Sequence, residues 1–83
     1  MKFEEFYNKY FGRVYNYARY RSASAEEADE ITALIFEKLL KKYDLFDEAK
    51  GSKEAWLFSV ARNVVNDYYR RKKIRAFFSL TSD

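Results

Sequence analysis

Apolar residues recur along most of the chain at intervals of three and four positions, the spacing that gathers side chains on one face of an α-helix. The pattern predicts helices over residues 3–20, 25–43 and 53–74. The first apolar face consists of Phe3, Phe6, Tyr7, Tyr10, Val14, Tyr17 and Ala18. The second consists of Ala28, Ile31, Thr32, Ile35, Leu39 and Tyr43, with Phe36 and Leu40 on its flank. The third consists of Leu57, Val60, Ala61, Val64 and Tyr68.

The breaks between these helices carry capping residues. Residues 24–27 read Ser-Ala-Glu-Glu, in which the Ser hydroxyl caps the third amide and the Glu reaches back. Residues 44–53 have no sustained periodicity and are expected to form a loop, with Leu45 and Phe46 packing inward as anchors. Ser52 is placed to cap the following helix, and Gly51 to supply a positive φ just before it.

Helix breakers are scarce, which favours an all-α fold. Proline is absent and the chain has two glycines, Gly12 and Gly51. Gly12 falls inside the first helix at a cost of about 1 kcal/mol relative to Ala, and we interpret it as a close-packing position. We predict a compact bundle of three main helices in a domain spanning residues 1–75. Residues 76–83 carry an apolar patch too short to form an element, and we expect them to begin a linker.

The composition excludes several classes of function. The 83 residues suffice for one domain, whose core draws on eight Phe, eight Tyr and one Trp. Without Cys or His, the chain lacks the residues of disulfides, thiolate metal sites and the usual proton shuttles. We therefore expect no metal, no cofactor and no enzymatic activity. No apolar run has the length of a membrane span and the N-terminus is acidic, so we predict a cytoplasmic protein.

The outer face of the third helix is the first candidate site. Six cations and one anion lie between residues 62 and 75, although the whole chain has a net charge of only +3. Opposite the apolar stripe lie Ser59, Arg62, Asn63, Asn66, Arg70 and Lys73, with Trp56 and Tyr69 at the seams. Cations late in a helix also complement its macrodipole, so a solvated helix end is the simpler interpretation. The two outward amides favour nucleic acid, because amides hydrogen-bond base edges.

Two further sets of residues allow more than one interpretation. Leu34 projects away from the apolar stripe of the second helix, beside Glu30 and Glu37. It is either an ordinary exposed Leu or part of an acidic and apolar patch for a protein partner. The cations of the first helix are expected to be solvated on its outer face: Arg13, Arg19 and Arg21.

Taken in order, the segments resemble region 2 of bacterial RNA polymerase sigma factors, of the extracytoplasmic-function (ECF) type in the sigma-70 family. The matching pieces are FEEFYNKYFGRVYNYA, SAEEADEITALIFEKLLKKYDLFD and WLFSVARNVVNDYYRRKK, which cover nearly the whole chain. The third piece, following an F-D-x-x-x-G loop, is the most specific of them. The resemblance implies a helical transcription initiation domain that docks on the clamp helices of the largest polymerase subunit and captures the minus-ten promoter element as single-stranded DNA.

Carried over by position, the resemblance assigns a polymerase-binding set on the second helix: Glu30, Ala33, Leu34 and Glu37. Relatives often carry Asp, Gln and Glu around these places. Ala33 and Leu34 depart from that pattern and imply a contact that is more apolar or weaker. Relatives of this type also carry a second helical DNA-binding domain, which is absent from this chain. The resemblance leaves open whether an anti-sigma factor is a further partner, and we expect the isolated domain to be a monomer.

The resemblance also implies a base-capture loop, formed by Phe46, Asp47, Lys50, Gly51 and Ser52. Trp56, Asn63 and outward neighbours such as Ser59 and Asn66 would line the DNA track, with Asn63 as the candidate for base-edge contact. Trp56 is equally well a core anchor. Phosphate contacts are expected from Arg62, Arg70, Arg71, Lys72 and Lys73. Asp67 is expected to orient neighbouring cations.

Two alternatives compete with promoter recognition. One is a helical protein-interaction module, a sigma-like regulator or adaptor that binds no DNA, supported by Leu34 and the departures in the second helix. The other places the basic aromatic helix on a membrane surface. We disfavour the membrane because the third helix has a complete core stripe of its own.

Overall fold

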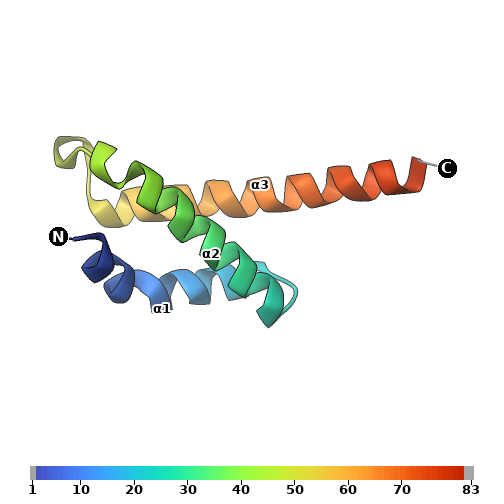
Figure 1. The fold of residues 1–83 in the computed structure, drawn as a ribbon, viewed down its shortest axis with the longest axis horizontal. Coiled ribbons are helices and arrows are strands. Elements are labelled where there is room, and N and C mark those ends of the chain that lie inside the picture. Colours follow the sequence, from blue (N-terminus) through green and yellow to red (C-terminus); the bar gives the residue numbers. More distant parts are fainter. Residues whose placement is uncertain (1, 82–83) are drawn as a thin grey trace.

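Helices make up most of the chain in the computed structural model, which describes residues 2–81 (Figure 1). The helices are α1 (Phe3–Arg21), α2 (Ala25–Lys42) and α3 (Lys53–Thr81). Two single 3-10 turns, η1 (Tyr43–Leu45) and η2 (Glu48–Lys50), lie in the connection between α2 and α3. The all-α prediction is confirmed. Of the predicted domain and linker, Met1, Ser82 and Asp83 lie outside the described residues.

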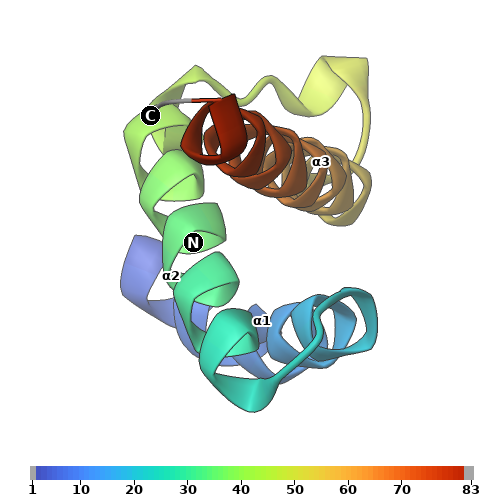
Figure 2. The same ribbon diagram turned by 90° about the vertical axis from the view of Figure 1, so that its right-hand side faces the viewer.

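Helix α2 crosses between the other two helices and packs against both of them (Figures 1 and 2). Helices α1 and α3 contact each other more sparsely. The buried apolar residues come from all three helices: Phe6, Tyr10, Val14, Ala18, Ala28, Ile31, Ile35, Phe36, Leu39, Leu57, Val60, Ala61, Val64 and Val65. The predicted apolar stripes therefore supply nearly all of the core. Val65, fully buried, is the member that the predicted stripe of the third helix omits.

The helix starts follow the predicted capping chemistry. Ser24 Oγ accepts a hydrogen bond from the Glu27 amide at 3.1 Å, and Glu27 Oε1 accepts one from the Ala23 amide at 3.0 Å. At α3, Ser52 Oγ accepts a hydrogen bond from the Ala55 amide at 3.0 Å. Gly51 has φ +144°, in the region that favours glycine. Each α-helix that follows a loop is thus fixed at its first turn by a local side chain.

Two expectations about single residues are wrong. A Cβ added at Gly12 would meet nothing within 4 Å, so this glycine is not a close-packing position. Leu45 is 79% exposed and does not anchor the loop. Phe46 does so alone, with its ring 5.2 Å from the Trp56 ring.

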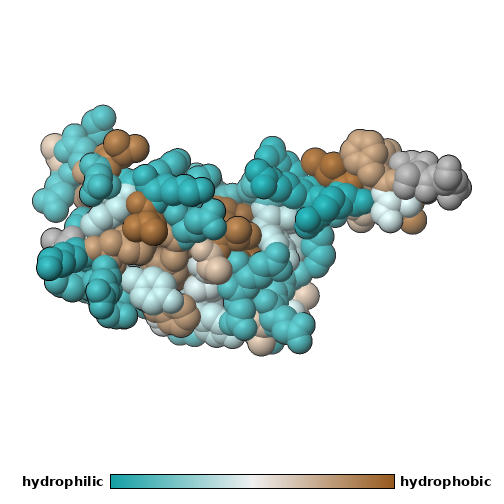
Figure 3. Space-filling model, in the orientation of Figure 1, coloured by the Kyte–Doolittle hydropathy of each residue, from teal (hydrophilic) through white to brown (hydrophobic). Residues whose placement is uncertain are grey.

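Helix α3 continues beyond its predicted end, through the segment predicted as a linker. Residues 76–81 are helical, because the run after Arg70 contains no Gly or Pro and is rich in good helix formers. This end of α3 projects past the bundle (Figure 1). Its large apolar side chains are exposed: Ile74, Phe77, Phe78 and Leu80. Figure 3 shows brown and tan surface near this end of the helix.

Candidate nucleic-acid and protein interfaces

The buried stripe of α3 fixes which of its side chains point outward. The buried stripe consists of Leu57, Val60, Ala61, Val64 and Val65, so the side chains on the opposite side of the helix face away from α1 and α2. Exposed side chains on that side are Arg62, Asn63, Asn66, Arg70, Arg71 and Lys73, and Ser59 is half-buried. The structure therefore brings most of the predicted DNA-binding residues of this helix onto one surface, which we call the α3 outer face. Arg71 lies at its border with α2, whereas Trp56 and Lys72 make contacts elsewhere.

Asp67 organises two of the cations on the α3 outer face. Its carboxylate pairs with Arg70 Nη2 at 2.5 Å and with Arg71 Nε at 2.9 Å. The predicted role of Asp67 in orienting cations is confirmed. Within the described part of the chain, Arg62, Asn63 and Lys73 have no side-chain hydrogen bond or ion pair. These three side chains are free to bind a ligand without breaking an internal contact.

Glu27, in the first turn of α2, forms polar contacts with two residues of α3. It is 8% exposed, yet its Oε2 pairs with Lys72 Nζ at 2.5 Å and its Oε1 accepts a hydrogen bond from the Tyr69 hydroxyl. The Lys72, Tyr69 and Ala23 donors lower the pKa of Glu27 from 4.5 to about 2. Burial and the bond to Glu27 raise the pKa of Tyr69 to about 12. The charge of Lys72, which the sequence assigned to phosphate, is committed to this contact.

Helix α1 also reaches the α3 outer face, which the sequence did not predict. Arg13 Nη2 pairs with Glu54 at 2.6 Å, and Arg21 Nη2 donates a hydrogen bond to Asn66 Oδ1 at 2.8 Å. The expectation that Arg13 and Arg21 are merely solvated is wrong. Helical periodicity holds no signal for these contacts, because the partners lie on a helix more than forty positions further along the chain.

Trp56 packs at the edge of the core, against the loop that connects α2 to α3. Its ring lies 6.2 Å from that of Phe6, 6.4 Å from that of Tyr43 and 5.2 Å from that of Phe46. These contacts favour the core-anchor interpretation, although the side chain remains half-exposed. In the loop, Asp47 caps η2 by accepting a hydrogen bond from the Ala49 amide at 2.9 Å. The side chain of Lys50 and the positions of Gly51 and Ser52 are exposed.

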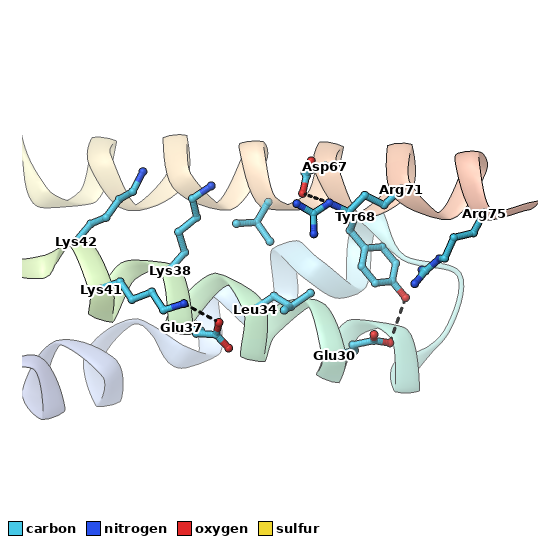
Figure 4. Close-up of a pocket in the computed structure, with 11 residues that line it drawn as sticks. Glu30, Leu34, Glu37, Lys38, Lys41, Lys42, Asp67, Tyr68, Arg71 and Arg75 are labelled. Carbon is cyan, nitrogen blue, oxygen red and sulfur yellow. Dashed lines mark hydrogen bonds and ion pairs between the residues drawn. The ribbon is translucent and has the colours of Figure 1, made fainter.

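A groove separates α2 from the second half of α3, and Leu34 lies in it with 39% of its surface exposed (Figure 4). Glu30 Oε2 accepts a hydrogen bond from the Tyr68 hydroxyl at 3.2 Å, and Glu37 pairs with Lys41 at 3.2 Å. The groove holds about 410 Å³ and is flanked on the α3 side by Asp67 and Arg71. Three of the four predicted polymerase-binding residues therefore line one surface feature.

Ala33, the fourth of that set, lies apart from the groove. It lines a smaller hollow on the α1 side of α2, with Tyr7, Phe11, Asp29, Thr32 and Phe36. The rings of Tyr7 and Phe11 are each 38% exposed there. The four predicted residues thus lie on the part of α2 between the groove and this hollow, and we call this part the α2 ridge.

The described residues contain neither a metal-binding cluster nor a membrane-spanning helix. No group of three or more His, Cys, Asp or Glu among residues 2–81 is arranged to hold a metal ion. Within the same residues, no helix combines the length and the apolar character needed to cross a membrane.

The fold and its surfaces define a three-helix domain with a basic, amide-bearing face on one helix and an amphipathic groove beside it. The chain belongs to the sigma-70 region 2 family, which it matches over residues 6–75. It is 30% identical over 73 residues to the ECF RNA polymerase sigma factor BldN of Streptomyces coelicolor, a match that covers 88% of this chain and 28% of that protein.

A second relative is the ECF RNA polymerase sigma factor SigX of Bacillus subtilis, 25% identical over 71 residues. That match covers 86% of this chain and 36% of the relative. The chain therefore spans about a third of the length of these relatives. No solved structure matches it significantly.

Proposed function

We propose that this domain acts in transcription initiation by docking on the clamp helices of RNA polymerase and holding the minus-ten promoter element as single-stranded DNA. The observation that carries the proposal is Asn63, an exposed amide that has no side-chain hydrogen bond within residues 2–81 and lies among cations on the α3 outer face. An amide contributes little to solubility at this position, whereas it can form hydrogen bonds with base edges.

The DNA strand runs along the α3 outer face toward the base-capture loop. Arg62 and the Asp67-oriented pair, Arg70 and Arg71, contact phosphates, which fix the position of the strand. Unstacking a base costs a few kcal/mol, and stacking on an aromatic ring returns about 1–3 kcal/mol per base. Phe46 and Trp56 at the foot of the loop supply such rings.

Polymerase docks on the α2 ridge, where Leu34 supplies an exposed apolar contact between Glu30 and Glu37. The two carboxylates are each held by one neighbour, Tyr68 and Lys41, and so present fixed acceptors to a basic partner. The domain performs no chemistry in this role, acts as a monomer and works in the cytoplasm with the polymerase.

The proposal is tested by binding the domain to a fluorescent single-stranded promoter-like library, with and without a clamp-helix fragment, across a salt series. Asn63→Ala should relax the sequence preference, and Arg62→Ala should weaken all sequences alike. Asn8→Ala on α1 is the matched amide control and should change neither. Binding without any sequence preference in the wild-type domain would remove the base-reading role of Asn63.

The Leu34 groove favours a second candidate, a protein-interaction module that binds no DNA. This alternative predicts clamp-fragment binding that Leu34→Ala weakens, together with no binding of single-stranded DNA at low salt. Leu45→Ala is the control, because Leu45 is also exposed but lies outside the groove. Strongly salt-dependent DNA binding would exclude this alternative.

A further inference from the structure

A shallow hollow of about 530 Å³ lies where the C-terminal end of α1 meets α3, and we call it the α1–α3 hollow. Its polar lining consists of Arg21, Asn66, Tyr69, Arg70, Lys72 and Lys73. No Asp or Glu of residues 2–81 belongs to that lining. The groove between α2 and α3 differs in this respect, since Glu30, Glu37 and Asp67 line it alongside its cations. The α1–α3 hollow is therefore suited to an anion.

Arg21 fixes the orientation of the amide in this hollow. Its Nη2 donates to Asn66 Oδ1 at 2.8 Å, while its Nη1 donates to the Tyr17 hydroxyl at 2.6 Å. The guanidinium also lies 5.7 Å from the Tyr17 ring centroid. Because Arg21 donates to Asn66 Oδ1, the amide is oriented with its oxygen toward Arg21, and both Nδ2 donors remain for a ligand. Asn66 is therefore oriented to act as a donor in the hollow.

Two cations that line the hollow form ion pairs with carboxylates that do not line it. Lys72 is paired with Glu27 at 2.5 Å and Arg70 with Asp67 at 2.5 Å, which positions both side chains before a ligand arrives. Within residues 2–81, Arg21 and Lys73 have no carboxylate partner. The hollow thus keeps uncompensated positive charge on a preorganised frame. A phosphate, which has acceptors only, matches this arrangement better than a base edge, which has donors as well.

We propose that the α1–α3 hollow binds a backbone phosphate of single-stranded DNA and that Arg21 holds Asn66 as a donor to that phosphate. The inference rests on the proposed function and refines it. The two amides of α3 then have different tasks: Asn63 reads a base, and Asn66 positions the strand. Arg21 extends the DNA-binding surface from α3 to α1.

The first test compares Arg21→Ala with Arg19→Ala in binding to single-stranded DNA across a salt series. Both variants remove one cation from the end of α1, but Arg19 lies outside the hollow. Arg21→Ala should weaken every sequence several-fold and reduce the slope of log K against log salt by about 0.7, the value for one lost phosphate contact on a single strand. Arg19→Ala should leave affinity and slope close to wild type.

A second test keeps the protein intact and changes the DNA. A neutral methylphosphonate linkage is moved along the oligonucleotide, and one position should weaken binding to the wild-type domain through the loss of this phosphate. In Arg21→Ala, the effect at that position should largely disappear while effects at other positions remain. Circular dichroism melting shows whether Arg21→Ala is folded. If it is not, the scan with the wild-type domain still tests whether one phosphate is critical for binding.

The outcomes separate this inference from the proposed function. If the wild-type domain binds DNA and Arg21→Ala behaves like Arg19→Ala, the α1–α3 hollow binds no phosphate. If Arg21→Ala changes sequence preference and leaves the salt slope unchanged, the hollow reads a base, and the inference is again overturned. If the wild-type domain binds no single-stranded DNA at low salt, the proposed function and this inference both fail.

Discussion

At the scale of single residues, the two glycines of the chain have opposite consequences. Gly12 lies within α1 with open space where a Cβ would sit, whereas Gly51 has φ +144°. Both have room for a methyl group, so backbone conformation alone distinguishes them. Gly12 carries the entropic cost of glycine in a helix without a packing reason, and Gly51 adopts a backbone that other residues reach only under strain.

Gly12→Ala should therefore raise the free energy of unfolding by about 1 kcal/mol. Gly51→Ala, the matched substitution, should lower it by roughly 1–3 kcal/mol. Urea unfolding followed by circular dichroism measures both changes. A loss of stability in Gly12→Ala would mean that this position contacts something that the open space in the structure does not show.

Thr32 makes a second prediction at this scale. It is 3% exposed, and its Oγ1 has no hydrogen-bond partner within residues 2–81. A buried unpaired hydroxyl costs about 1–3 kcal/mol. Thr32→Val keeps the shape and removes the hydroxyl, so it should raise the free energy of unfolding by roughly 1 kcal/mol. Thr32→Ser keeps the hydroxyl and loses the methyl group, and should be destabilising; equal effects of the two substitutions would contradict this explanation.

At the scale of elements, one ionised carboxylate adds a polar contact to the apolar packing of α2 against α3. The folded state lowers the pKa of Glu27 from 4.5 to about 2, so its contribution to stability is complete above pH 4.5 and is lost as pH falls toward 2. The charge of Glu27 holds Lys72 and Tyr69, and both donors come from one turn of α3. Protonation of this single group therefore loosens the two helices together.

Glu27→Gln should lower stability at pH 7 and make it less dependent on pH between 4.5 and 2. Thermal unfolding of the variant and the wild type across that window measures the difference. Glu26→Gln removes the exposed carboxylate next to it and is the control, which should keep the wild-type loss of stability in acid. A Glu27→Gln profile parallel to wild type would mean that the Lys72 contact adds nothing in solution.

At the scale of the whole molecule, the bundle and the projecting end of α3 are energetically separate. The described residues extend 51 Å along their longest axis, and the last turns of α3 supply no residue to the core. Leu80 is 84% exposed, and Phe77 and Phe78 are more than half exposed. A helix segment of this kind depends on the bundle for nucleation and returns little to it.

Removing residues 76–83 should therefore change the free energy of unfolding by less than about 0.5 kcal/mol, the usual range for surface changes. The helical signal at 222 nm should fall in proportion to the residues removed. Denaturant unfolding of the shortened and the complete chain tests this at two protein concentrations. A large loss of stability would show that the apolar tip packs on the bundle or on another copy of the chain.

The amino-acid sequence by itself determined the helices, the apolar stripes and the caps at Ser24 and Ser52, because each depends on residues a few positions apart. It also determined that Arg62, Asn63, Arg70 and Lys73 point outward, since helical periodicity places them opposite the apolar stripe. The end of α3 has no buried apolar stripe to mark it, so periodicity does not predict that residues 76–81 are helical.

Only the tertiary structure decided which charges remain free. Lys72 is paired with Glu27 and Arg13 with Glu54, whereas Arg21 contacts the neutral amide of Asn66 and has no carboxylate partner within residues 2–81. Each contact joins residues more than forty positions apart. Such contacts follow from how α1, α2 and α3 are placed around one another, which no local pattern encodes. The exposed charges of a sequence are therefore an upper limit on its binding surface, and packing selects the ones that a ligand meets.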